Sequence, residues 1–168
     1  MIRPPRQRTL VKGIFLGFVL LAVCSLIHTA GMVCIGERLR KKRENLNRRI
    51  GVSTFSLLLS SVFVAIVLLH LAEIIIWTVA YDRLDLLNGF GASLDFSIGA
   101  YTCNSPSAIQ LPEEWKRLGQ LESLAGLLLV GLSTAFLFLA MRKMFELRHT
   151  AKSQESQPRR TPQRSKIR

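Results

Sequence analysis

The sequence predicts an all-α integral membrane protein with three transmembrane helices and a short re-entrant helix and loop ahead of the last one. Three long apolar stretches carry almost no charge: residues 13–36 have none, 52–81 have only Glu73, and 118–141 have only Glu122. About 20 apolar residues cross a bilayer as a helix, so each stretch is long enough. A shorter apolar segment lies within 82–117, between the second and third stretches.

The first stretch, 13–36, follows a basic tail (1–12) and precedes a basic loop (37–51). The apolar part of a cleaved signal peptide is about 7–15 residues long and ends at small residues. This stretch is longer and leads directly into Glu37 and Arg38, so we expect a retained transmembrane helix. The second helix is predicted over 52–81, where Trp77 and Tyr81 suit the outer interface.

The segment 82–117 combines a half-crossing helix with a polar loop. Ser93 and Asp95 can begin a helix that runs through Tyr101, which is too short to cross a bilayer. Non-helical backbone at membrane depth is tolerated only where protein or a water-filled cavity surrounds it. The residues that follow, 102–110, therefore predict an enclosed lumen. Because one chain of three helices cannot enclose a lumen, several copies are expected to assemble.

The third helix is predicted over 118–141, because Arg142 and Lys143 end its apolar run. Small residues in this helix favour close helix contact; they are Gly119, Ala125, Gly126 and Gly131. The tail, 142–168, is basic and rich in Ser, Gln and Pro. That composition is typical of a disordered segment.

The net charge of +12 is unevenly distributed and predicts the orientation of the chain. Loop 37–51 and the tail 142–168 are strongly basic, whereas 82–117 is acidic. Cytoplasmic loops are enriched in Lys and Arg, so the loop and the tail are predicted to be cytoplasmic and 82–117 external. Three spans then place the N-terminus outside, against the preference of its four basic residues. The basic segments suit anionic lipids rather than nucleic acid as a partner.

The remaining composition argues against other classes of protein. No set of residues resembles a catalytic triad, a phosphate-binding glycine loop or a carboxylate pair, so we expect no enzyme and no cofactor. Cys24, Cys34 and Cys103 have no spacing that fits a disulfide framework or a zinc site, so no metal is expected. No arginine series lies in a span, which argues against voltage sensing.

The loop and the last span carry a resemblance to a known family. Residues 102–112 read TCNSPSAIQLP, and 111–138 read LPEEWKRLGQLESLAGLLLVGLSTAFLF. They resemble the bacterial pore-loop potassium channels, in which the loop reads T-T-x-G-Y-G-D-I-x-L-P, and His70, Glu73 and Trp77 resemble the second helix of those channels. The resemblance implies a homotetramer with a pore helix, a selectivity filter, a pore-lining third helix and monovalent cations as permeant ions.

The filter signature itself is altered in this chain. The filter-equivalent residues are Thr102, Cys103, Asn104, Ser105, Pro106, Ser107 and Ala108. A potassium filter aims rings of backbone carbonyls at one axis, which requires positive φ angles that glycine adopts freely. Each serine in a left-handed conformation would cost about 1–2 kcal/mol, and proline fixes its own φ near −65°. We therefore predict a non-selective or non-conducting pore.

Several other residues are candidates for functional or packing roles. His70 and Glu73 lie three residues apart on one helix face; they either support the pore helix or form a proton-sensitive pair, or they simply fix packing. His28 is expected to be a packing residue. Glu122 suits the start of the third helix, support of the pore helix or an outer vestibule. Candidates for a hinge or an inner cavity are Gly126, Gly131, Ser133 and Thr134.

Three functional hypotheses follow from these observations. The first is a potassium-channel-like, pore-forming subunit of the inner membrane that assembles as a homotetramer. The second is a non-conducting membrane scaffold or regulatory subunit that co-assembles with an intact channel or another membrane partner. The third is a structural three-helix protein whose half-helix lies on the outer surface.

Overall fold

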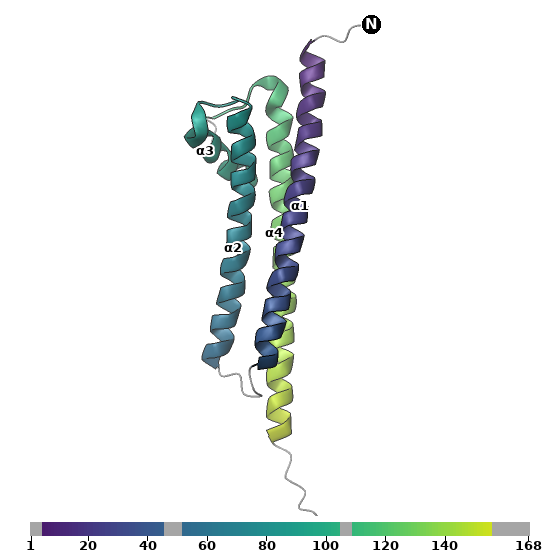
Figure 1. Ribbon diagram of the computed structural model, residues 1–168, viewed down its shortest axis with the longest axis vertical. Coiled ribbons are helices and arrows are strands. Elements are labelled where there is room, and N and C mark those ends of the chain that lie inside the picture. Colours follow the sequence, from purple (N-terminus) through teal and green to yellow (C-terminus); the bar gives the residue numbers. More distant parts are fainter. Residues whose placement is uncertain (1–4, 46–51, 105–108, 156–168) are drawn as a thin grey trace, which may run out of the picture.

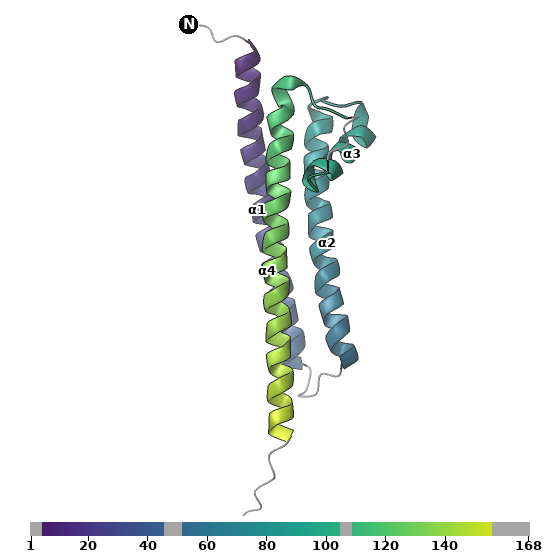
Figure 2. The ribbon, with the colours of Figure 1, turned by 180° about the vertical axis from the view of Figure 1, so that it is seen from behind.

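The protein is a bundle of three long helices with a fourth, short helix packed against one end (Figure 1). The computed structural model describes residues 5–45, 52–104 and 109–155. Within these ranges it contains helices and no strands: α1 (Pro5–Asn45), α2 (Val52–Arg83), α3 (Gly89–Tyr101), a 3₁₀ turn η1 (Glu113–Trp115) and α4 (Lys116–Glu155). The long helices run side by side with alternating direction (Figures 1 and 2).

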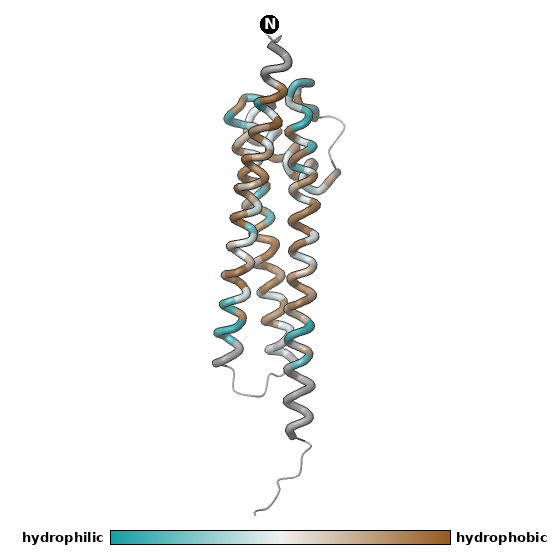
Figure 3. The backbone as a smooth tube through the Cα atoms, turned by 90° about the vertical axis from the view of Figure 1, so that its right-hand side faces the viewer, coloured by the Kyte–Doolittle hydropathy of each residue, from teal (hydrophilic) through white to brown (hydrophobic). Residues whose placement is uncertain are grey.

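All three long helices have apolar segments that are long enough to cross a membrane: Leu10–Lys42, Ser56–Arg83 and Glu113–Lys143. Hydropathy is highest along the middle of the bundle, and hydrophilic residues gather near its two ends (Figure 3). Many large apolar side chains are exposed on the outside, among them Phe15, Leu57 and Phe138. This surface suits lipid, as expected for a multi-pass membrane protein.

Two helices extend well beyond the apolar runs that predicted them. α1 includes part of the predicted tail and loop, and α4 continues to Glu155, through residues predicted to be disordered. The extra turns are rich in Arg, Lys, Glu and Leu, which are good helix formers. In α4 the Arg142 Nε and Glu146 Oε1 atoms also pair at 3.1 Å. The rest of the predicted tail, 156–168, lies outside the described residues.

α3 begins earlier than the sequence indicated, at Gly89, whose φ of 84° allows the sharp turn out of α2. Ser93 does not cap the helix; it is buried in it, and its hydroxyl donates to the carbonyl of Gly89. The helix ends at Tyr101, where the amide of Asn104 donates to the Gly99 carbonyl at 2.7 Å. The bond from Asn104 completes the last turn of α3.

α3 runs back alongside α2 and α4 instead of lying across the end of the bundle (Figures 1 and 2). Its Ser97 hydroxyl donates to the carbonyl of Ile74 on α2, and Ser123 of α4 donates to the carbonyl of Ala100. Ser123 lies seven residues into α4, so the C-terminal end of α3 is about 10 Å below the start of α4. The chain then returns to that end and begins α4 there.

Small residues permit this packing, as the sequence predicted for Gly119 and Gly126. A Cβ at Gly126 would lie 2.2 Å from the backbone oxygen of Tyr101, and one at Gly119 would lie 2.9 Å from the ring of Phe96. Gly131 differs, because nothing lies within 4 Å of the place its Cβ would take. Gly126 is therefore a packing position under α3, whereas Gly131 lies on an open face.

Replacing Gly126 by Ala should lower the free energy of unfolding by about 1–3 kcal/mol, because the new methyl group meets backbone that cannot rotate away. Gly131→Ala is the matched control and should leave stability unchanged or slightly higher, since its methyl group meets open space and alanine favours the helix. Unfolding in mixed detergent micelles measures both. Equal effects of the two substitutions would contradict the packing described for α3.

Candidate functional site

Two acidic side chains are completely buried within the apolar spans: Glu73 on α2 and Glu122 on α4. Burying an ionised carboxylate without partners costs many kcal/mol, so each must be paired or neutralised. Each of them lies at the centre of a hydrogen-bonded cluster that includes α3. These two clusters are the candidate site.

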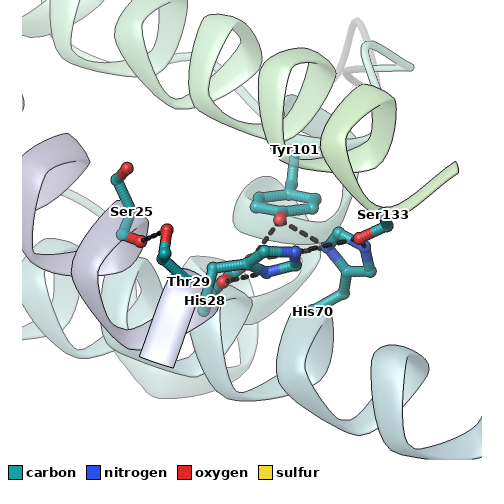
Figure 4. A network of polar contacts seen from close by, with 7 residues as sticks. Ser25, His28, Thr29, His70, Tyr101 and Ser133 are labelled. Carbon is teal, nitrogen blue, oxygen red and sulfur yellow. Dashed lines mark hydrogen bonds and ion pairs between the residues drawn. The ribbon is translucent and has the colours of Figure 1, made fainter. Parts of the chain in front are cut away.

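The first cluster is a closed ring of five side chains contributed by all four helices (Figure 4). We call it the polar ring; its members are His28 of α1, His70 and Glu73 of α2, Tyr101 of α3 and Ser133 of α4. The two imidazole rings lie with centroids 4.9 Å apart. The ring is at the level where α3 ends, because Tyr101 is the last residue of that helix.

Both histidines contact the carboxylate of Glu73 and the hydroxyl of Ser133. His28 Nδ1 lies 2.7 Å from Glu73 Oε1, and His70 Nδ1 lies 3.4 Å from Glu73 Oε2. The opposite nitrogens meet a single atom: Ser133 Oγ lies 2.9 Å from His28 Nε2 and 3.0 Å from His70 Nε2. The two imidazoles therefore bridge the same carboxylate and the same hydroxyl group.

Tyr101 closes the ring between His70 and Glu73. Its hydroxyl donates to Glu73 Oε2, and its oxygen lies 2.7 Å from His70 Nδ1. Burial, followed by the adjacent Glu73 carboxylate, raises the pKa of Tyr101 far above its usual range. The phenol therefore stays protonated and acts as a permanent donor to Glu73.

With both histidines neutral and Glu73 ionised, the ring has one donor proton fewer than it has hydrogen-bonding contacts. Tyr101 and Ser133 each have one hydroxyl proton, and each neutral imidazole has one N–H, which gives four donors. Five contacts close the ring. In one arrangement Tyr101 donates to Glu73 and His70 Nδ1 donates to Tyr101. Ser133 then donates to His70 Nε2, and His28 Nε2 donates to Ser133. All four protons are used in these contacts, so the contact between His28 Nδ1 and Glu73 Oε1 has no proton of its own.

The second cluster, which we call the Glu122 cluster, joins α2, α3 and α4 through its carboxylate. Tyr81 Oη donates to Glu122 Oε2 at 2.6 Å, and Ser97 Oγ donates to Glu122 Oε1 at 2.5 Å. Glu122 therefore contacts α3 from α4, and its side chain has no exposed surface. Nearby, Trp77 Nε1 is the one buried side-chain nitrogen or oxygen without a partner among the described residues.

The filter-equivalent residues are described only in part. Thr102, Cys103 and Asn104 are exposed at the end of α3, and Ser105, Pro106, Ser107 and Ala108 lie outside the described residues. Cys103 has a φ of 56°, a left-handed conformation that costs a non-glycine residue about 1–2 kcal/mol. Its thiol lies 3.8 Å from the carbonyl of Ser123 on α4.

The predicted hinge and cavity residues of α4 separate onto two faces. Gly126 and Ser133 point into the bundle, against Tyr101 and the two histidines, whereas Gly131 and Thr134 are exposed. The exposed pair belongs to a continuous line of exposed positions with helical spacing along α4, which we call the open stripe: Gln120, Leu124, Leu127, Gly131, Thr134 and Phe138.

Sequence reasoning found His70 and Glu73 as a pair but not the ring around them. It treated His28 and Ser133 separately and gave no role to Tyr101 or Ser97. It placed Trp77 and Tyr81 at the outer interface, whereas both side chains are fully buried and Tyr81 binds Glu122. The available signal was the presence of ionisable and polar residues inside apolar spans, since such groups usually face the interior and pair with one another. The partners come from different helices, so their spacing in the sequence carried no information.

No family model, curated protein or solved structure matches this chain.

Ser133→Ala should lower the free energy of unfolding by about 1–3 kcal/mol, because it leaves the Nε2 atoms of buried His28 and partly buried His70 without this partner. Thr134→Ala is the matched control one residue away. Its hydroxyl bonds only to the Val130 carbonyl of its own helix and is exposed, so a change within about 0.5 kcal/mol is expected. Denaturant unfolding in micelles checks both, and a neutral Ser133→Ala would show that the ring contributes nothing to stability.

Proposed function

We propose that this protein is a potassium-channel-like, pore-forming subunit of the inner membrane that assembles as a homotetramer and has lost an ordinary potassium filter. The observation that carries the proposal is the position of Thr102, Cys103 and Asn104. They are exposed, polar and non-helical in part, and they lie at the inner end of a helix that turns back into the bundle.

The depth of this loop supports a lumen. Cys103 contacts the Ser123 carbonyl, about 10 Å along α4 from its start and inside the candidate span of that helix. Exposed backbone and polar side chains at such depth are unfavourable in lipid, because nothing there can satisfy their hydrogen bonds. Water in a shared cavity satisfies them. Four copies around an axis supply that cavity.

The direction of α3 favours a cation in the same place. The C-terminal end of a helix carries a partial negative charge, and the C-terminal end of α3 is the one that points into the bundle. The exposed hydroxyl of Thr102 lies at that end. A monovalent cation in the lumen is the species that this arrangement favours.

The open stripe of α4 is the proposed wall of the lumen. It contains Gln120, Gly131 and Thr134, which are less suited to lipid than the large apolar residues on the outer faces of the bundle. Cys103 approaches α4 at Ser123, within one turn of Gln120 and Leu124. The loop and the stripe therefore form one surface, with His70, Glu73 and Glu122 supporting α3 from behind.

Orientation and lipid partners belong to the same proposal. The beginning of α1 lies at the same end as α3 and η1, and the basic end of α4 lies at the other (Figure 1). We place the basic loop and tail in the cytoplasm, where anionic lipids attract them. The acidic segment 82–117 then faces the exterior.

The wild-type protein, reconstituted in planar bilayers, should show either no current or a current that does not distinguish potassium from sodium. Restoring the family signature with Cys103→Thr, Ser105→Gly, Pro106→Tyr, Ser107→Gly and Ala108→Asp should produce potassium-selective current, because the two glycines supply the positive φ angles that aligned carbonyls need. Reversal potentials in mixed potassium and sodium solutions measure the selectivity.

The control for this experiment keeps Ser105 and Ser107 and changes only Cys103, Pro106 and Ala108. Without the glycines it should remain unselective. A potassium-selective current from the wild-type protein would show that the altered filter still works. Absence of current from the restored protein, when it is folded and inserted, would count against a pore.

A non-conducting scaffold or regulatory subunit is the second candidate, and one observation favours it. α3 is held by Glu73 through Tyr101 and by Glu122 through Ser97, and none of these four residues belongs to the filter-equivalent loop. The frame therefore persists whether or not the loop coordinates an ion. Co-purification of an intact channel from the native membrane is the observation that would select this candidate.

Oxidative cross-linking tests the tetramer that the pore requires. A variant whose one cysteine is Cys103 should form disulfide-linked pairs in membranes, because the loops of neighbouring copies meet around the axis. The matched control keeps Cys34 instead, which is exposed on α1 far from the loop, and should stay monomeric. Cross-linking of Cys34 but not Cys103 would place another surface at the interface and remove the lumen.

A further inference from the structure

We propose that His28, His70 and Glu73 form a binding site for one divalent transition-metal ion of the zinc class. The three residues each offer one ligand atom, and these atoms all lie within 4.8 Å of one another. This inference concerns the purified chain and does not depend on whether the protein conducts ions. It differs from the expectation from the sequence that no metal binds, because the three ligands come from two helices and lack a zinc-type spacing.

The distances are close to those of a metal centre. Zinc binds histidine nitrogen and carboxylate oxygen at roughly 2.0–2.2 Å, so tetrahedral ligand atoms lie about 3.4 Å apart. His70 Nδ1 and Glu73 Oε2 are 3.4 Å apart, and His28 Nδ1 and Glu73 Oε1 are 2.7 Å apart. Side-chain rotations on the order of 1 Å bring a set spread over 4.8 Å to metal-binding distances.

The outer contacts of the two imidazoles suit metal ligands. A histidine that binds a metal through one nitrogen normally donates its other N–H to an oxygen acceptor, which fixes the tautomer and the ring orientation. Here both Nε2 atoms lie within hydrogen-bonding distance of Ser133 Oγ, and a hydroxyl oxygen has two lone pairs to accept both. With both protons on Nε2, the lone pair of His28 Nδ1 faces Glu73 Oε1 at 2.7 Å. The lone pair of His70 Nδ1 lies 3.4 Å from Glu73 Oε2 and 2.7 Å from Tyr101 Oη, so metal binding would replace the hydrogen bond between His70 and Tyr101.

That tautomer leaves a position between the ligands that a proton or a metal ion can fill. Two lone pairs, on His28 Nδ1 and Glu73 Oε1, otherwise face each other at 2.7 Å. A proton shared by His28 Nδ1 and Glu73 Oε1 would complete this one contact. A divalent metal would bind these two atoms and His70 Nδ1 together. Two imidazole nitrogens and one carboxylate favour zinc, copper or nickel over magnesium or calcium, which prefer oxygen ligands. Tyr101 holds the second carboxylate oxygen in place.

A bound metal would join α1 directly to α2, and it would hold α3 and α4 through Tyr101 and Ser133. Ligand binding to the folded state alone stabilises that state in proportion to the logarithm of ligand concentration. The site therefore predicts that the packing of all four helices responds to zinc.

The test uses the full chain, purified in detergent without a histidine tag and treated with a chelator. The background carries Cys34→Ser, Cys103→Ser and His149→Gln, which removes the exposed thiols and the third histidine as competing ligands. Each chain should bind one zinc ion, and zinc should raise the unfolding temperature. Cobalt should give the visible absorption bands of a tetrahedral site with nitrogen and oxygen ligands.

Variants of the ring should show graded effects. His28→Asn and His70→Asn each remove one ligand atom while keeping a polar side chain of similar shape, and each should abolish stoichiometric binding. Glu73→Gln should do the same. Ser133→Ala keeps all three ligands and removes only their shared acceptor, so affinity should fall about 10–100-fold. Thr134→Ala is the matched control: it removes an exposed hydroxyl one residue from Ser133 that bonds to the Val130 carbonyl of its own helix, and it should bind zinc like the parent.

Two outcomes would overturn the proposal. One is a folded parent that retains no zinc after gel filtration and shows no cobalt bands, which would leave a proton as the cation in the ring. The other is binding that survives in His28→Asn and His70→Asn, which would place the metal elsewhere. If a ligand variant fails to fold, the Ser133→Ala and Thr134→Ala pair still decides, since a ring site weakens in the first and not in the second.

Discussion

The fold depends on the need to satisfy two carboxylates that lie inside an apolar bundle. Glu73 and Glu122 have no exposed surface, and a bilayer around them offers no water. Every hydrogen-bond partner must then come from the protein, and each acid takes one from α3: Tyr101 for Glu73 and Ser97 for Glu122. A helix of thirteen residues, too short to span, is thereby fixed at a depth that its own apolar surface would not define.

The position of α3 in turn decides what is left exposed. Gly126 allows the backbone of Tyr101 to approach α4 closely, and Ser123 binds the carbonyl of Ala100. With the end of α3 held there, Thr102, Cys103 and Asn104 have no room in the bundle and project to its outside. The same packing turns the open stripe of α4 away from α1, α2 and α3. Support on one side and exposure on the other are consequences of a single arrangement.

The helices could be predicted from sequence because their signal is local. Long uncharged runs define the spans, and the short apolar segment that ends at Tyr101 indicated α3, although its start was predicted at Ser93 and lies at Gly89. Helix ends were less predictable, since the basic turns after residue 36 and residue 141 are compatible with either helix or coil once they leave the bilayer. Lys and Arg are good helix formers, and the structure extends both helices.

The polar ring was beyond the sequence because it is a property of five residues that are brought together from four helices. The pair at positions 70 and 73 was visible, since three residues form less than one helical turn. His28, Tyr101 and Ser133 are separated from Glu73 by 45, 28 and 60 positions, and only the packed helices bring them together. Each of them alone has an ordinary explanation as a packing residue, so no motif could single them out.

The ring also constrains what charge the bundle can hold at its centre. With neutral histidines and an ionised Glu73, it would be a buried anion with one contact unsatisfied, which is costly at low dielectric. One added proton makes the cluster neutral and completes five contacts. A divalent metal would complete the carboxylate and imidazole contacts instead. Tyr101 and Ser133 belong to α3 and α4, the two helices that border the exposed loop, so the species held by His28 and Glu73 would act on both helices through two hydroxyl groups.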